Sequence, residues 1–180
     1  MTITDPHHGP ELVVLLNNEG TEIGTAQKYA IHTAETPLHL AFSCHVYDSA
    51  GRILLTRRAL SKKTWGGVWT NSFCGHPGPG ESFEDAINRR AAQELGMMVS
   101  GITPVLPGFR YRAVDASGVV ENEICPVYRA TIDGGLQPVP EEVAECAWCT
   151  PEELRSAIEA APFAFSPWLV EQVAQGALGS

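Results

Sequence analysis

The strongest constraint on the fold is a stretch that turns sharply and then begins a helix. Residues 71–77 hold a cysteine and a histidine, Cys74 and His76, two positions apart. The Pro-Gly-Pro-Gly run at 77–80 cannot lie inside a regular helix or strand. The acidic segment at 81–85 is typical of a helix start. A thiol and an imidazole on a stiff turn before a helix are predicted to form a reactive site.

The helix after this turn carries a signal at each end. Ser82 is the expected N-cap, and Asp85 at the third helical position is expected to complete a capping box. Gly96 stands where a left-handed residue commonly ends a helix. Apolar residues recur every four positions and predict a buried helix face, formed by Ile87, Ala91 and Leu95. A neighbouring face is expected to point at the loop that carries Cys74; it is formed by Ala86, Arg90 and Glu94.

Apolar runs and turns predict the remaining elements. Two further helices are expected, one capped by Thr150 with Glu153 in a capping box and one starting at Ser166. Strands are expected at 11–16 (closing a hairpin with the turn at 17–20), 38–47, 52–57, 109–114 and 119–130, and a basic loop at 59–67. Strands first and interleaved helices later predict an α/β or α+β fold in layers.

Length and charge restrict the possible functions. The 180 residues show no repeat and predict one domain, 1–180, in which residues 1–25 form an N-terminal extension with a hairpin. A net charge of -9 argues against wholesale binding to nucleic acid or to an anionic membrane. Residues 1–10 do not resemble a signal peptide, and the five cysteines are an odd number. We therefore expect reduced thiols and a cytoplasmic location.

Glu121 and Glu123 lie two positions apart in a predicted strand, so both side chains project from one face. Two carboxylates at so short a separation repel each other, and burial increases the free-energy cost of keeping both ionised. Either this face is solvated or a cation neutralises the pair. The apolar neighbours Val120 and Ile124 favour the cation.

Three histidines could complete a metal site with these carboxylates. A single histidine is more often a hydrogen-bonded core or surface residue than a ligand. Three histidines and two glutamates would form a set suited to Mn²⁺ or Zn²⁺. The spacing matches no standard zinc signature. The candidate histidines are His32, His39 and His76.

Half of the twelve basic residues fall in or near the predicted site loops. In an acidic chain this concentration indicates an anionic substrate, most simply a phosphate or diphosphate, although solvated loops would have the same composition. The residues are Lys28, Arg57, Arg58, Lys62, Lys63 and Arg90.

The Cys-X-X-Cys pair at 146 and 149 has no second pair to complete a zinc site and no strand-to-helix redox context. Its two side chains would face opposite sides of a strand. We interpret Cys44, Cys125, Cys146 and Cys149 as small core residues.

Residues 75–97 resemble a degenerate Nudix box. Five positions of the box are in register, namely Gly75, Glu81, Arg89, Glu94 and Gly96. Arg90 and Gln93 replace two of the carboxylates with which Nudix hydrolases hold Mg²⁺. An arginine at a metal-binding position inverts the local charge, which argues against hydrolysis by that mechanism.

With this departure the chain resembles the type I isopentenyl diphosphate isomerases, over residues 28–173. The matching runs are 36–42, 56–63, 69–72, 74–77, 109–113, 121–123 and 165–168. The resemblance implies a Nudix-type α/β/α sandwich with a mixed sheet and an extra N-terminal hairpin. It also implies interconversion of isopentenyl diphosphate and dimethylallyl diphosphate through a tertiary carbocation-like state.

The resemblance assigns roles residue by residue. It implies Cys74 and Glu123 as the catalytic acid/base pair, Tyr111 beside Glu123, and Trp168 over the carbon skeleton of the substrate. It implies a divalent ion (Mn²⁺, Zn²⁺ or Mg²⁺) on His32, His39, His76, Glu121 and Glu123, Mg²⁺ between Glu94 and the diphosphate, and phosphate contacts from Lys28, Arg58, Lys62 and Arg90.

Two other functions remain open on the sequence. A Nudix hydrolase of a nucleoside diphosphate derivative would share the fold. A metal-stabilised binding module would explain the histidines but not Cys74 or the basic residues. In each case the expected partner is a small molecule, without nucleic acid or membrane, and the chain is expected to be a monomer or weak homodimer.

Overall fold

The computed structural model describes residues 11–179. Its strands are β1 (Leu12–Leu16), β2 (Glu22–Gln27), β3 (His39–Leu40), β4 (Phe42–Tyr47), β5 (Ile53–Arg58), β6 (Trp69–Thr70), β7 (Phe73–Gly75), β8 (Met98–Leu106), β9 (Arg110–Val114), β10 (Val120–Ile124), β11 (Val127–Asp133) and β12 (Val143–Cys149). Its helices are α1 (Lys28–Ile31), α2 (Phe83–Leu95), α3 (Pro151–Ala160) and α4 (Pro167–Ala174), with a 3-10 turn at Pro162–Ala164.

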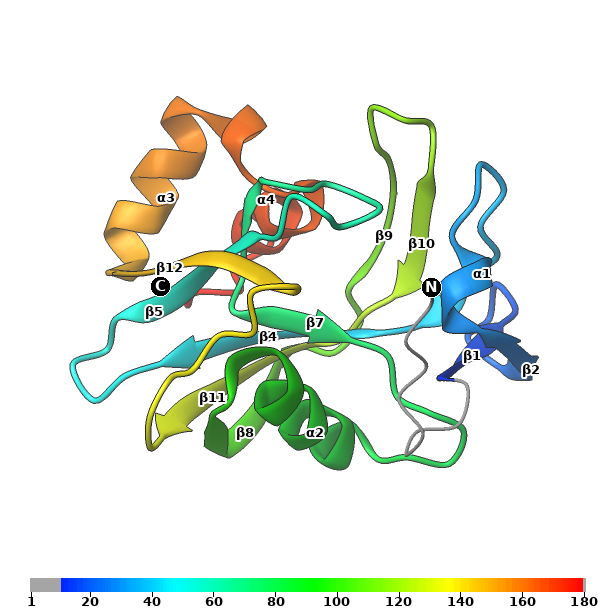
Figure 1. The fold of residues 1–180 in the computed structure, drawn as a ribbon, viewed down its shortest axis with the longest axis horizontal. Coiled ribbons are helices and arrows are strands. Elements are labelled where there is room, and N and C mark those ends of the chain that lie inside the picture. Colours follow the sequence, from blue (N-terminus) through cyan, green and yellow to red (C-terminus); the bar gives the residue numbers. More distant parts are fainter. Residues whose placement is uncertain (1–10, 180) are drawn as a thin grey trace.

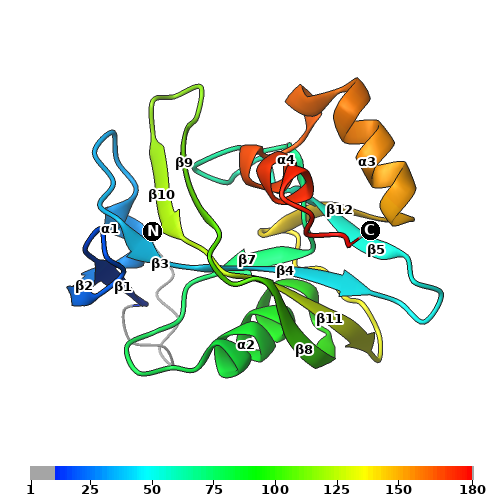
Figure 2. The same ribbon diagram turned by 180° about the vertical axis from the view of Figure 1, so that it is seen from behind.

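The strands form two mixed sheets. One has the order β2-β1-β3-β10-β9 and the other β12-β5-β4-β11-β8, with β6 beside β5 and β7 beside β4. The β3–β10 and β4–β11 pairs are parallel, and the other strand pairs are antiparallel. Helix α2 covers one side of the second sheet and α3 and α4 the other (Figure 1), as the view from behind also shows (Figure 2). The predicted layered fold with a mixed sheet is confirmed.

Two strands predicted as continuous are each divided between the sheets, so both predictions were wrong in length. The run 38–47 breaks at Ala41 into β3 and β4, and the run 119–130 breaks at 125–126 into β10 and β11. Pro126 has no N–H and a fixed φ, which disfavours a central ladder position. The two segments stay side by side across the break, since Ala41 N donates to Ile124 O at 2.9 Å and Ser43 N donates to Pro126 O at 3.1 Å.

Helix α2 follows its predicted signals with one correction. Ser82 Oγ accepts from Asp85 N at 3.1 Å, but the Asp85 carboxylate accepts from Ser82 Oγ rather than from the N-cap backbone, so the predicted capping box is incomplete. Gly96 ends the helix at φ 55°. The side chain of Ile87 packs with Phe42 and Phe73 in the core between α2 and the sheet, together with Ala91 and Leu95.

Gly75 allows α2 to approach β7 closely. A Cβ atom there would lie 2.7 Å from Arg90 Cγ and 2.8 Å from Phe42 Cζ. Any side chain at this position would push the helix away from the sheet, and with it the Arg90 guanidinium.

The other layer forms where α3 and α4 meet the opposite face of the sheet. Thr150 and Glu153 form the predicted capping box of α3, and Ser166 Oγ accepts from Leu169 N at the start of α4. The strands β6, β7, β8 and β12 and the short helix α1 were not predicted. The N-terminal hairpin is confirmed as β1 and β2, which end at Gln27; residues 1–10 of the predicted extension lie outside the described part. The assignment of the chain to one domain stays a prediction.

The predicted core cysteines divide into two pairs. Cys44 and Cys125 are buried, whereas Cys146 and Cys149 on β12 are half-buried. All are free thiols, and Cys146 and Cys149 both lie in β12. Within residues 11–179 no helix has the length and apolarity needed to cross a bilayer.

A buried histidine in β4 predicts a measurable dependence of stability on pH. His45 is fully buried, its Nε2 lies 2.9 Å from Gln172 Oε1, and burial lowers its pKa to about 4. The unfolded chain therefore binds a proton that the folded chain excludes, and the share of stability that depends on neutral His45 is lost as pH falls from about 6.5 to about 4. This share changes by about 2 kcal/mol between pH 7 and pH 5. In the His45→Gln variant, the free energy of unfolding measured with urea is expected to lose that much of its change between pH 7 and pH 5. The same pH dependence in the variant and the wild type would contradict this prediction.

Candidate active site

A pocket of about 370 Å³ collects the predicted site residues. Every residue given a site role lines it except His39, which is fully buried behind the wall. Arg57 of the predicted basic group does not line the pocket and pairs with Glu145 instead. The residues that line the pocket come from several elements: the N-terminal hairpin region, β7, α2, α4, the β9–β10 hairpin and the loop that follows β5. Its size lies in the range of small-molecule sites.

Three imidazoles and one carboxylate lie together in the pocket wall, in an arrangement that could hold a metal ion. The ring centroids of His32, His39 and His76 lie 5.1–5.8 Å apart. One donor atom from each histidine and one carboxylate oxygen of Glu123 all lie within 4.8 Å of one another. Glu121 lies outside this group: one of its oxygens is 2.9 Å from His32 Nε2 and the other accepts from Thr64 Oγ1 at 2.9 Å.

The histidine nitrogens fit a divalent ion. His39 Nδ1 lies 2.9 Å from Pro37 O, which fixes the proton on Nδ1 and leaves the Nε2 lone pair directed at Glu123 and the other rings. His32 Nε2, His39 Nε2 and His76 Nδ1 are buried without hydrogen-bond partners. Buried imidazole nitrogens without partners are costly unless a ligand satisfies them. The donor set therefore fits a divalent metal.

The protonation states differ across the group. Burial lowers the pKa of His76 to about 4, so this ring is neutral. Burial raises the pKa of Glu123, but the close contacts of its carboxylate with the His39 and His76 rings outweigh this effect and hold the pKa well below its usual value. A neutral imidazole and an ionised carboxylate are the forms that bind metals.

The thiol and the aromatic side chains lie at the apolar end of the pocket. Cys74 comes from β7, and burial raises the pKa of its thiol. Tyr111, from β9, has a pKa well above its usual value because of burial and of the nearby Glu123 charge, so its phenol keeps its proton. The Trp168 ring lies 5.7 Å from the Tyr111 ring and 5.5 Å from the Arg58 guanidinium.

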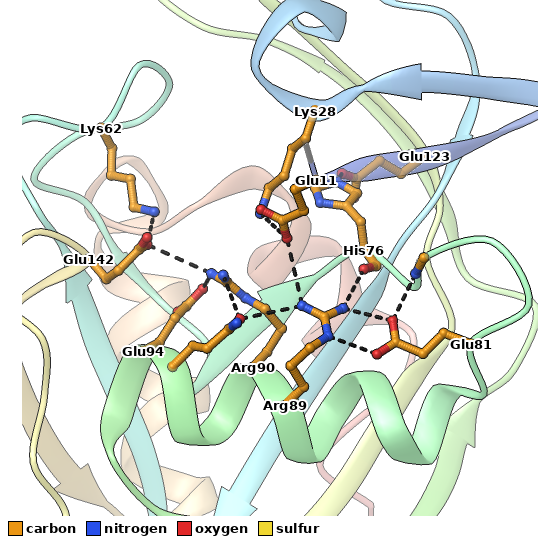
Figure 3. Close-up of polar contacts among 12 residues, drawn as sticks. Glu11, Lys28, Lys62, His76, Glu81, Arg89, Arg90, Glu94, Glu123 and Glu142 are labelled. Atoms are coloured by element: carbon orange, nitrogen blue, oxygen red, sulfur yellow. Dashed lines mark hydrogen bonds and ion pairs between the residues drawn. The ribbon is translucent and has the colours of Figure 1, made fainter. Parts of the chain in front are cut away.

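The other end of the pocket is cationic, and each of its principal cations has a carboxylate partner (Figure 3). Lys28 Nζ donates to Glu11 Oε1 at 2.9 Å, and Lys62 donates to Glu142. Arg90 pairs with Glu94 on the same helix and lies 3.8 Å from Glu142. The side chains of Lys28, Lys62 and Arg90 are 25%, 25% and 8% exposed. This burial lowers the pKa of each of the three cations.

Glu11 and Glu142 were not predicted from the sequence. Glu11 precedes β1 and Glu142 precedes β12, and neither stands in a motif or near another site residue along the chain. Only the packing of β1 and β12 brings them to Lys28 and Lys62. No local signal could have found them.

The Glu81–Arg89 pair fastens the Pro-Gly turn to α2. Arg89 Nε and Nη2 donate to the two Glu81 oxygens at 2.7 Å, and Nη2 also donates to His76 O at 3.1 Å. Gly78 N donates to Glu81 Oε2 at 2.8 Å. A bidentate pair of this kind holds both loop and helix, and so positions His76.

Comparison with known proteins agrees with this geometry. The NUDIX domain profile matches residues 37–169. The isopentenyl-diphosphate Delta-isomerase of Kocuria rhizophila is 62% identical over 169 residues, covering 94% of each chain. The proteins of the same name from Paenarthrobacter aurescens and Corynebacterium glutamicum are 61% and 54% identical, covering 92% and 91% of this chain and 90% and 89% of theirs. The chain belongs to the isopentenyl-diphosphate Delta-isomerase family, and its domain is a Nudix domain.

Solved structures of lower identity confirm the fold. A protein from Deinococcus radiodurans has a TM-score of 0.70 at 23% identity, covering 92% of this isomerase-family chain and 98% of its own. The MutT protein of Methanosarcina mazei has a TM-score of 0.60 at 16% identity, covering 77% and 92%. This member of the isomerase family therefore keeps the Nudix architecture while carrying Arg90 and Gln93 in its box.

Proposed function

We propose that this chain interconverts isopentenyl diphosphate and dimethylallyl diphosphate. The observation that carries the proposal is the composition of one pocket. Its apolar end holds a thiol, a carboxylate and two aromatic rings, and its other end holds Lys28, Lys62 and Arg90. A hydrolase needs carboxylates where Arg90 and Gln93 stand, so the box is suited to binding a diphosphate rather than cleaving it.

The cations are proposed to bind the substrate diphosphate. Lys28, Lys62 and Arg90 are partly desolvated, and a multivalent anion would restore the interactions that burial removes. Arg58 donates through Nε and Nη2 to Thr64 O, at 3.2 and 3.0 Å, which leaves Nη1 for the diphosphate. These contacts would orient the hydrocarbon chain toward Cys74 and Trp168.

The proton transfers fall to Cys74 and to Glu123 with Tyr111. Isopentenyl diphosphate gains one proton at its terminal CH₂ and loses one from the CH₂ on the other side of the branched carbon, so protons balance. The Cys74 thiol and the Tyr111 phenol hold protons and the Glu123 carboxylate is ionised, so both a donor and an acceptor are present. The reaction is reversible, and donor and acceptor exchange roles in the reverse direction.

We propose His32, His39, His76 and Glu123 as ligands of a Mn²⁺, Zn²⁺ or Mg²⁺ ion, with Glu121 next to them. Such an ion would hold the Glu123 carboxylate and neutralise part of its charge. Glu94 is proposed as the carboxylate that meets a Mg²⁺ brought by the diphosphate. The ion pair of Glu94 with Arg90 would then open as substrate enters.

Trp168 is proposed to stabilise the cationic intermediate with its ring face. A desolvated cation–π contact contributes about 2 kcal/mol, so Trp168→Ala is expected to lower kcat about 30-fold. The dissociation constant for inorganic diphosphate should change much less, because the phosphate contacts come from other residues. Steady-state kinetics and calorimetry measure the two quantities. Trp168→Phe, which keeps a ring, is the matched control; equal losses in turnover and binding would indicate a packing role instead.

The direct test of the function is isomerisation in D₂O. The protein is incubated with isopentenyl diphosphate and Mg²⁺, and deuterated dimethylallyl diphosphate is expected by NMR. Phosphate release from nucleoside diphosphate derivatives, with no isomerisation, would favour the hydrolase. Loss of folding on metal removal without any product would favour the binding module.

The remaining features of this proposal concern its setting. We propose a cytoplasmic enzyme that acts as a monomer or weak homodimer on a small diphosphate, without nucleic acid or membrane. Free cysteines at all five positions agree with a reducing compartment.

A further inference from the structure

One buried amide contacts both the thiol and the indole of the proposed site. Asn71 lies between β6 and β7 and is fully buried. Its Oδ1 accepts from Trp168 Nε1 at 3.0 Å and from Cys74 Sγ at 3.3 Å. Thr70 Oγ1 donates to the same oxygen at 2.9 Å. One oxygen thus joins β7, which carries the thiol, to α4, which carries the indole.

The other half of the amide fixes its orientation. Asn71 Nδ2 donates to Phe73 O at 2.7 Å and to Cys44 O at 3.2 Å. Both carbonyls belong to the β4–β7 strand pair. Rotation of the amide would place its oxygen against two carbonyls and its NH₂ against three donors, so the observed orientation is the satisfiable one.

A second bridge joins α4 to the same thiol. Gln172 lies one turn after Trp168, is fully buried, and donates from Nε2 to Ser43 Oγ at 2.8 Å. Ser43 Oγ lies 3.3 Å from Cys74 Sγ. Residues four apart share one helix face, so this face of α4 reaches the thiol through Asn71 at one position and through Ser43 at the other.

We propose that Asn71 is a positioning residue that sets the separation and orientation of the Cys74 thiol and the Trp168 indole. The inference rests on the proposed function, because the reaction requires a defined distance between the thiol and the indole. The thiol must reach a carbon next to the one whose charge the indole stabilises. Asn71 lies behind the pocket wall and does not line it, so it acts through its two neighbours.

A purely structural role for Asn71 would give a different result. Loss of a buried amide also lowers stability, so stability alone does not separate the two possibilities. Positional errors of about 1 Å lower turnover about 100-fold without affecting contacts elsewhere. The decisive quantity is therefore the division of the effect between kcat and KM.

The test compares Asn71→Ala with Thr70→Val. The first removes the acceptor of both catalytic side chains, and the second removes only the third donor to the same oxygen and its contact with Ser166. Asn71→Ala is expected to lower kcat about 100-fold with KM changed less than about threefold. Thr70→Val is expected to lower the melting temperature but to keep kcat within about threefold of the wild type. Asn71→Ser, whose hydroxyl is too short to reach the indole, replaces the alanine variant if that one does not fold.

A second measurement does not need turnover. The alkylation rate of Cys74 by iodoacetamide, followed by peptide mass spectrometry, is expected to change severalfold in Asn71→Ala and to stay near the wild-type value in Thr70→Val. If the wild type does not isomerise its substrate, the proposed function fails while this measurement still reports on Asn71. Wild-type kcat in Asn71→Ala, equal effects of the two variants on kcat, or an unchanged alkylation rate would overturn the inference.

Discussion

Replacing Cys74 with alanine is expected to lower kcat by about 10²–10⁴-fold and to leave the fold intact. An unactivated alkene is a weak base, so isomerisation needs a proton donor and a proton acceptor on the two sides of the carbon chain. Cys74 is the pocket's thiol, and Glu123 and Tyr111 come from a different hairpin. Alanine removes the sulfur and leaves one side without a proton carrier. Turnover is measured with isopentenyl diphosphate, and folding by circular dichroism.

Cys125→Ala is the matched control for this variant. Cys125 Sγ lies 3.5 Å from the same Ser43 hydroxyl that contacts Cys74, but Cys125 is fully buried and does not line the pocket. Its loss should lower stability by roughly 1–2 kcal/mol through lost packing and keep turnover. Ordinary activity of Cys74→Ala, or equal losses in the two variants, would remove Cys74 from the mechanism.

Local signals predicted the part of the site that is built from one stretch of chain. The Pro-Gly run, Ser82 and Gly96 fixed where α2 begins and ends, and the four-residue repeat then placed Arg90 and Glu94 on the face toward the Cys74 loop. Each of these signals depends on backbone preferences within a few residues. Such preferences can be read without knowing what packs against them, and here they agree with the fold.

The division of the two long strands depended on contacts between distant segments. Residues 38–47 contain no glycine or proline, and nothing near Ala41 marks a break. The break coincides with Pro126, which lies between β10 and β11, and the parallel neighbours β3 and β4 divide at the same level. This change of sheet brings His39 and Glu123 to the end of one sheet and Ser43 to the start of the next. The metal-binding group and the thiol therefore meet at the junction.

The Nudix box shows how one motif can keep its geometry and change its chemistry. Arg89 and Glu81 form a bidentate pair that holds the turn on α2, a purely local task. Arg90 on the next face enters the pocket and pairs with Glu94 and Glu142. The sequence predicted that Arg90 inverts the charge of the box. It could not predict Glu142, whose carboxylate balances that charge from a distant strand end.

Replacing Glu123 with glutamine is expected to reduce both turnover and metal affinity. Its carboxylate is the oxygen donor of the four-residue group and lies 3.1 Å from His76 Nε2 and 3.3 Å from His39 Nε2. A neutral amide cannot take up a proton from the substrate, so kcat should fall by about 10²–10⁴-fold. It also removes the negative charge that attracts a divalent ion to the three imidazoles. Turnover and the calorimetric affinity for Mn²⁺ measure the two effects.

Glu121→Gln separates the role of Glu123 from the general charge of the site. Glu121 lies two residues away, contacts His32 at 2.9 Å and accepts from Thr64, but its carboxylate is outside the group of four donors. Removing the same charge at Glu121 should weaken Mn²⁺ binding less than Glu123→Gln does. It should also lower kcat less, because Glu121 has no proposed role in proton transfer. If Glu121→Gln loses as much turnover as Glu123→Gln while binding Mn²⁺ equally well, the proton carrier on this side of the pocket is not Glu123 alone, and the two carboxylates act as one unit.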